Sequence, residues 1–153
     1  MTAQINTPRW GGESPSGAWE KPLVYGMHVY GNLYECDESI LRDEVKLTEI
    51  VKRAAEVANA TVVSLFYYRF GGSGGLSVVA IVAESHISIH TWPEHRYATV
   101  DVYTCGAHTN PLAAFKYIVK ELKAKSYRLN ISDRSLYNGD SGQLAENINL
   151  EEP

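Results

Sequence analysis

The segment from Glu84 to Glu94 concentrates residues that could do chemistry in this chain of 153 residues. It reads Glu-Ser-His-Ile-Ser-Ile-His-Thr-Trp-Pro-Glu and follows an apolar run over residues 78–83. Ser85 supplies a hydroxyl nucleophile, while the two histidines of the segment supply imidazoles, which titrate near neutral pH and can move protons. Two kinds of site fit these residue types: a serine acting on a nearby carbonyl, or a metal site.

The spacing of the histidines argues against a metal site. On a helix, His86 and His90 would share one face, but β-branched residues alternate with them and Pro93 stops the run. On a strand, residues four apart lie about 13 Å from each other, too far to share one zinc, whose ligand bonds are about 2 Å long. The alternation predicts a half-buried strand. His95 and His108 fall in predicted loops and remain open as ligands.

The motifs around Ser85 resemble the processing site of the S-adenosylmethionine decarboxylase family in its short prokaryotic form, a pyruvoyl enzyme made as a proenzyme. The resemblance rests on Glu-Ser-His at 84–86, His-Thr-Trp-Pro-Glu at 90–94 and Thr-Cys-Gly at 104–106, and in weaker form it covers about residues 24–135. Decarboxylation of an α-amino acid leaves negative charge on Cα, which a carbonyl group that forms a Schiff base can take up.

A serine becomes such a carbonyl group when its hydroxyl attacks the preceding carbonyl carbon and forms an ester. Loss of the Cα proton then expels the ester as a carboxylate, and the remaining dehydroalanine hydrolyses to a pyruvoyl group. By resemblance, the chain breaks between Glu84 and Ser85, and Ser85 becomes the pyruvoyl cofactor. The resemblance also implies that His90 accepts the Cα proton, that Ser77 polarises the scissile carbonyl, and that Cys105 returns a proton to the product carbon.

The sequence leaves the substrate open between S-adenosylmethionine and arginine, which some relatives of the family decarboxylate with the same machinery. The chain departs from the common family pattern in the glycine-rich loop over 71–75 and at Asn32, where an acid is common. Phe70 is a candidate platform for adenine, or else a core residue, and Glu94 is a candidate ribose or cation contact.

A third hypothesis is a processing-dead homologue that regulates a competent partner. The presence of all three implied processing and catalytic residues, Ser85, His90 and Cys105, argues against it.

Length and composition fit one compact domain, with 44% hydrophobic residues. The net charge of −4 argues against a nucleic-acid protein. No segment is long and apolar enough to cross a membrane, and the first residues do not form a signal peptide. With two expected free thiols, we expect a cytoplasmic protein. We predict a disordered tail over 1–22, a single decarboxylase domain over 23–137 and a flexible acidic tail over 138–153.

Alternation and turn residues predict strands over 24–34, 61–70, 76–83, 85–92, 97–104 and 126–131. Helices are expected over 44–58 and from Asn110-Pro111 onward, with Asp37 capping a short turn between the first strand and the first of these helices. Each long helix should bury one apolar stripe, made of Leu47, Ile50, Val51, Ala54 and Ala58 in the first and Leu112, Phe115, Ile118, Val119 and Leu122 in the second.

Successive strands followed by single helices predict an α+β fold, a two-layer α/β sandwich with an antiparallel-rich sheet and helices on one face. The bare face of such a sheet would need a partner. The resemblance implies the same arrangement, a homodimer of cleaved protomers with two long fragments (1–84), two short fragments (85–153) and active sites near the interface.

Overall fold

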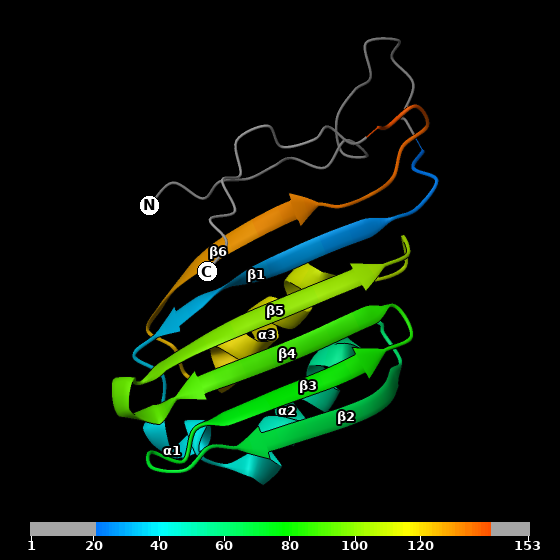
Figure 1. Ribbon diagram of the computed structural model, residues 1–153. Coiled ribbons are helices and arrows are strands. Elements are labelled where there is room, and N and C mark those ends of the chain that lie inside the picture. Colours follow the sequence, from blue (N-terminus) through cyan, green and yellow to red (C-terminus); the bar gives the residue numbers. More distant parts are fainter. Residues whose placement is uncertain (1–20, 142–153) are drawn as a thin grey trace, which may run out of the picture.

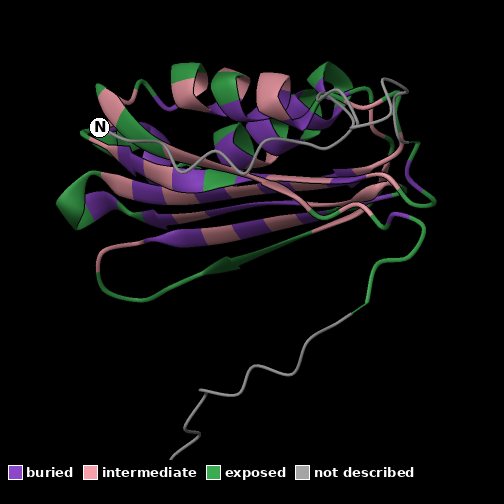
Figure 2. Ribbon diagram, turned by 90° about the horizontal axis from the view of Figure 1, so that it is seen from above, coloured by how far each residue is buried: buried purple, intermediate pink, exposed green. Residues whose placement is uncertain are grey.

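The computed structural model describes residues 21–141 of the chain. Six antiparallel strands form one sheet in the order β2-β3-β4-β5-β1-β6 (Figure 1). Figure 2 shows the helices on one side of the sheet only. Within residues 21–141 no helix covers the other side, which is called the open face below. The predicted α+β two-layer architecture is therefore confirmed.

The elements follow one another in the predicted order. Their bounds are β1 Gly26–Tyr34, α1 Glu38–Leu41, α2 Glu44–Val57, β2 Val62–Arg69, β3 Leu76–Val82, β4 Ser85–Trp92, the short 3-10 helix η2 Pro93–His95, β5 Tyr97–Cys105, α3 Pro111–Glu121 and β6 Ser126–Asp133. The predicted strand ends differ from these by at most two residues. The first strand was predicted to start at residue 24 but starts at Gly26. Val24 makes only an isolated bridge to Leu136 and is not part of the ladder.

Polar side chains cap the helices where the sequence predicted helix starts. The carboxylate of Asp37 accepts hydrogen bonds from the backbone of Ser39 and Ile40 at the start of α1, and Asp43 caps α2. The side chain of Asn110 accepts from the backbone of Ala113, with a proline at the first helical position. These caps satisfy backbone donors that have no partner within the helix.

The core lies between the helices and the covered face of the sheet. The predicted stripe of α2 is fully confirmed, since all five of its residues are buried. In α3, Phe115, Ile118 and Leu122 are buried, but Leu112 and Val119 are only partly buried. The prediction was wrong for these two because they lie seven residues apart, on a line along the flank of the helix, where they pack at the margin of the core.

The predicted tails over 1–22 and 138–153 fall mostly outside the described residues. At their inner margins, the backbone N–H of Leu23 donates to the carbonyl of Leu136 at 2.7 Å, so that the two ends of the described chain meet beside β1 and β6. Among residues 21–141, none of the helices has the length and hydropathy needed to span a bilayer.

Candidate active site

Ser85 begins β4 directly after the tight turn that joins it to β3. Its backbone φ is +141°, a conformation that residues with a side chain rarely adopt and that costs about 1–3 kcal/mol when the surrounding structure enforces it. The ladders of β3 and β5 enforce it here, because Ser85 is paired with Val82 on one side and Thr104 on the other. The backbone of Ser85 is therefore strained at its N–Cα bond, directly after the Glu84–Ser85 peptide, and is held in place.

Cys105 lies beside the peptide bond between Glu84 and Ser85. Its backbone N–H donates a hydrogen bond of 2.7 Å to the carbonyl oxygen of Glu84. A donor in this position polarises the carbonyl carbon and stabilises negative charge that develops on its oxygen. The thiol of Cys105 is free and partly buried. The structure thus brings three of the predicted residues, Glu84, Ser85 and Cys105, to the same end of the sheet.

Ser77 and His90 form a second group farther along the same strands. They are paired across β3 and β4, and the hydroxyl oxygen of Ser77 lies 2.6 Å from Nδ1 of His90. His90 follows Ser85 by five residues on β4, which places the two Cα atoms about 16 Å apart. Within one chain, the structure does not bring Ser77 or His90 to Ser85.

Phe70 and Glu94 lie at the His90 end of the sheet. Phe70 follows β2, where its backbone N–H bonds to the carbonyl of Gly75 across the glycine-rich loop. Phe70 is 51% exposed, which excludes the core interpretation, and its role as a platform for adenine stays a prediction. Glu94 is exposed in η2, four residues after His90. Hydrogen bonds from its own backbone N–H and from Ser73 lower the pKa of its carboxyl group, so it is an anion at neutral pH.

Comparison with known proteins identifies the family. The family model described as S-adenosylmethionine decarboxylase matches residues 27–135. The S-adenosylmethionine decarboxylase proenzyme of Pyrobaculum aerophilum is 63% identical over 115 residues, which cover 75% of this chain and 92% of the relative. The proenzyme of Sulfurisphaera tokodaii is 58% identical over 119 residues, with 78% and 96% covered. The chain belongs to the S-adenosylmethionine decarboxylase family.

The crystal structure of the adenosylmethionine decarboxylase from Aquifex aeolicus supports this assignment in three dimensions. It superposes with a TM-score of 0.70 at 38% sequence identity, covering 78% of this chain and 98% of that one. The resemblance predicted from the motifs around Ser85 is confirmed. Proenzymes of the S-adenosylmethionine decarboxylase family acquire a covalent pyruvoyl cofactor, which is made from a serine when the proenzyme cleaves itself. The strained backbone of Ser85 and the polarised carbonyl of Glu84 fit that origin.

A cluster of polar and aromatic residues on the open face was missed by the sequence analysis. Nε2 of His28 on β1 lies 2.8 Å from Oδ1 of Asp101 on β5, within hydrogen-bonding distance. The rings of His28 and His86 both contact Tyr103, which Arg134 covers at 4.5 Å. Burial, reinforced by the nearby His28, lowers the pKa of His86. His28 and Asp101 are 73 residues apart in sequence, and no local motif links them.

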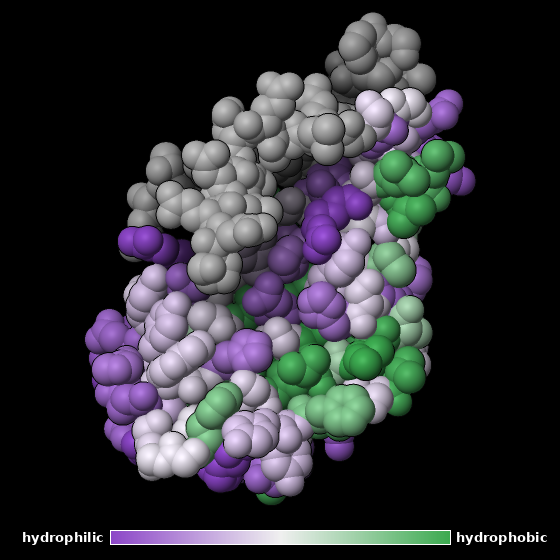
Figure 3. All heavy atoms as spheres, viewed as in Figure 1, coloured by the Kyte–Doolittle hydropathy of each residue, from purple (hydrophilic) through white to green (hydrophobic). Residues whose placement is uncertain are grey.

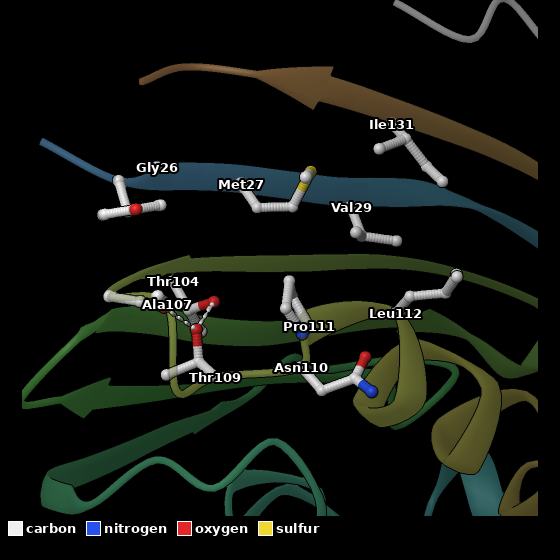
Figure 4. A pocket seen from close by; sticks show the side chains of 12 residues that line it. Gly26, Met27, Val29, Thr104, Ala107, Thr109, Asn110, Pro111, Leu112 and Ile131 are labelled. Carbon is white, nitrogen blue, oxygen red and sulfur yellow. Dashed lines mark hydrogen bonds between the residues drawn. The ribbon is translucent and has the colours of Figure 1, made fainter. Parts of the chain in front are cut away.

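A cavity lies on the helix side of the sheet (Figure 4). It has a volume of about 600 Å³ and lies between the start of β1, the residues after β5 and the start of α3. The twelve residues that line it carry no charged side chain. A guanidinium would therefore find no acidic partner in this cavity. Among residues 21–141, no group of three or more His, Cys, Asp or Glu is placed to hold a metal.

Proposed function

We propose that this chain is the proenzyme of a pyruvoyl-dependent decarboxylase of S-adenosylmethionine, which produces the aminopropyl donor for spermidine and other polyamines. The observation that carries the proposal is the hydrogen bond from Cys105 to the carbonyl of Glu84, next to a serine in a strained conformation. Both features favour attack on this one peptide bond. The names of the family relatives supply the substrate.

Maturation begins when the hydroxyl oxygen of Ser85 attacks the carbonyl carbon of Glu84. The hydroxyl proton passes to the amide nitrogen as the C–N bond breaks, and an ester replaces the amide. A base then removes the Cα proton of Ser85, and the bond between Cβ and the ester oxygen breaks, so that Glu84 leaves as a carboxylate. Dehydroalanine remains, and water converts it to the pyruvoyl group with release of ammonia. We assign the base to His90, whose imidazole suits proton transfer at neutral pH.

Cys105 acts at both stages through different atoms. Its backbone N–H stabilises charge on the scissile oxygen during maturation, and its thiol returns a proton to the product carbon during turnover. A pyruvoyl group supplies the electron sink that decarboxylation of an α-amino acid needs. The thiol suits its role because the register places Cys105 next to the partner of Ser85 on β5.

The separation of the two groups within one chain supports a homodimer. If His90 and Ser77 act on Ser85, they must come from a second copy, since about 16 Å of strand separates His90 from Ser85 in the same chain. A two-fold axis that lies in the interface and crosses the strands would bring the Ser85 end of one open face over the His90 end of the other. Such an isologous interface uses the same surface twice.

The open face has the composition of such an interface. Several of its large apolar side chains are exposed, and they gather over β2 and β3 in Figure 3. Phe66 and Tyr68 lie on β2 and Ile81 lies on β3, while the exposed Tyr30 lies apart from them on β1. Contiguous apolar surface of this kind marks an interaction site. A cytoplasmic location fits the two free cysteines.

Phe70 and Glu94 make the site selective for S-adenosylmethionine over arginine. Both lie at the His90 end of the sheet, so in the dimer they would reach the pyruvoyl of the other copy. The exposed ring of Phe70 offers a stacking surface for adenine, and the carboxylate of Glu94 can accept hydrogen bonds from ribose hydroxyls. Arginine would instead favour bidentate pairing of its guanidinium with a carboxylate.

Decarboxylation assays test the proposal directly. Purified protein is incubated with S-adenosylmethionine or with arginine under identical conditions, and released carbon dioxide is measured. We expect kcat/KM to be clearly higher for S-adenosylmethionine. A preference for arginine would move the protein to the alternative substrate and leave the maturation chemistry in place. Release from neither substrate by a cleaved chain would contradict both proposed activities and favour a regulatory homologue.

A further inference from the structure

The side chain of Glu84 is held on both of its oxygens. Oε2 accepts a hydrogen bond of 3.0 Å from the backbone N–H of Thr61, and Oε1 lies 3.5 Å from Nε2 of His108. The Glu84 side chain is only 13% exposed. The hydrogen bond from Thr61, then one from the backbone N–H of Glu84 itself and the interaction with His108, lower the pKa of the Glu84 carboxyl group. The side chain is therefore a fixed anion next to the scissile bond.

The two partners of Glu84 are themselves tied to the fold. The carbonyl of Thr61 accepts from the backbone N–H of Ala83 at 2.8 Å, so Thr61 holds both residues of the turn. The carbonyl of His108 accepts from the Asn59 side chain at 3.1 Å. The His108 ring lies against Gly106, where a Cβ atom would come within 2.7 Å of it. Only glycine leaves room for the ring in this position.

We propose that Thr61 and His108 position the acyl half of the scissile bond by clamping the Glu84 side chain, so that His108 is a positioning residue for self-cleavage. Because the carbonyl oxygen of Glu84 is held separately by Cys105, the clamp fixes the residue at a second point. Two fixed points prevent the carbonyl carbon from rotating away from the Ser85 hydroxyl. This inference rests on the proposed self-cleavage at Ser85.

The clamp acts on the proenzyme and has no contact with Phe70, His90 or Glu94, which the proposed function assigns to later steps. Loss of the clamp should slow the formation of the pyruvoyl group without changing turnover by the sites that have formed. A general loss of stability would not produce that separation. Neither would a role of His108 in decarboxylation.

The test measures the cleavage rate of newly synthesised chains by pulse-chase and gel electrophoresis. Glu84→Ala removes the acceptor of the Thr61 hydrogen bond, and we expect cleavage to slow about 2- to 12-fold, the net effect of losing one hydrogen bond. His108→Ala, at a more exposed position, should slow cleavage about 2- to 5-fold. His108→Gln keeps an N–H donor of similar reach and should restore most of the rate.

Three controls keep the outcome interpretable. His95→Ala replaces an exposed histidine at the other end of the sheet and should cleave at the wild-type rate. Thermal unfolding of each variant, made in a Ser85→Ala chain, checks the fold. Turnover of His108→Ala, expressed per mole of pyruvoyl, should equal that of wild type.

Cleavage of Glu84→Ala and His108→Ala at the wild-type rate would overturn the clamp while leaving the proposed function intact. Equal slowing by His108→Ala and His108→Gln would also overturn the positioning role of the His108 donor. A wild-type chain that never cleaves would instead refute the proposed function itself.

Discussion

The carbonyl oxygen of Glu84 accepts a hydrogen bond of 2.7 Å from the backbone N–H of Cys105. The two residues belong to different halves of the chain after cleavage, yet this bond crosses directly from the β3–β4 turn to the end of β5. It places the donor on the atom where negative charge grows when the serine hydroxyl attacks. Because the donor is a backbone group, substitution of the cysteine side chain leaves it in place.

Replacing Ser85 should abolish cleavage. Wild-type protein should separate into fragments 1–84 and 85–153, and the shorter fragment should carry a blocked N-terminus that reacts with carbonyl reagents. Ser85→Ala lacks the attacking hydroxyl, so it should remain one chain without decarboxylase activity. Ser88→Ala, on the same strand, is the matched control and should cleave normally. Intact mass spectrometry locates the break, and a wild-type chain that is uncleaved yet fully active would refute the pyruvoyl origin.

Cys105→Ala should separate maturation from turnover. The variant keeps the backbone N–H that contacts Glu84, so it should still cleave. It loses the thiol that returns a proton to the product carbon, and we expect kcat to fall about 100-fold or more, the usual effect of removing a general acid. Steady-state kinetics per mole of pyruvoyl measures the effect. Cys36→Ala is the control, since Cys36 is fully buried in the core and its replacement should leave kcat unchanged. An unchanged kcat in Cys105→Ala would refute the role of the Cys105 thiol as proton donor.

Burial of Cys36 should also make stability depend on alkaline pH. Burial raises the pKa of its thiol from 9.0 to about 11, because the folded protein disfavours the thiolate. In the unfolded chain the thiol ionises first, so the stability contributed by the neutral thiol is complete below about pH 9 and is lost as the pH rises to about 11. The loss should be at most about 3 kcal/mol. Denaturant unfolding in a Ser85→Ala background measures it, and the slope attributable to this thiol should be absent after a further Cys36→Ala substitution.

Local sequence patterns predicted the elements well because each element is marked by nearby residues. Alternating apolar residues predicted all six strands, and Asp37 and Asn110 marked helix starts that the structure confirms. The flank residues of α3 were harder, because their burial depends on where the helix lies against the sheet. The pairing of His28 with Asp101 and of Glu84 with His108 could not be predicted, since each pair meets only through the strand order.

The spacing of the motifs did not predict that the site residues of one chain form two separate groups, one around Ser85 and one around His90. Ser85 and His90 belong to one short motif, and nearness in sequence suggests nearness in space. A strand extends about 3.3 Å per residue, so five residues carry His90 away from Ser85. Ser85 and His90 are close in sequence but lie at opposite parts of β4, and this separation follows from the sheet register.

Phe70→Ala should weaken the binding of S-adenosylmethionine. Loss of one aromatic stacking surface costs about 1–3 kcal/mol, which corresponds to a rise in KM of about 5- to 150-fold. Cleavage should be unaffected, because neither the attack on the Glu84 carbonyl nor the removal of the Cα proton is assigned to Phe70. Tyr67→Ala is the matched control, since Tyr67 is a comparably exposed aromatic residue on β2 whose strand partner Val78 is buried against the helices. Equal KM values for both variants would remove Phe70 from the substrate site.

Co-expression of two inactive variants should restore cleavage if the site is shared between two copies. His90→Ala alone should cleave about 100- to 10,000-fold more slowly, because the base that takes the Cα proton is lost, and hydroxylamine should break the accumulated ester. Ser85→Ala alone cannot cleave. In a mixed dimer, the His90→Ala chain keeps its serine and receives an intact His90 from the Ser85→Ala chain, so one complete site forms.

Different affinity tags on the two chains make the outcome specific. Only the His90→Ala chain should be cut in the mixed dimer, and the Ser85→Ala chain should remain whole. Purification through one tag shows whether the other chain accompanies it, which separates a failure to dimerise from a failure to complement. Mixed dimers that form but leave both chains intact would show that His90 does not act across the interface. The base for maturation would then have to lie within about a hydrogen bond's reach of Ser85 on its own chain.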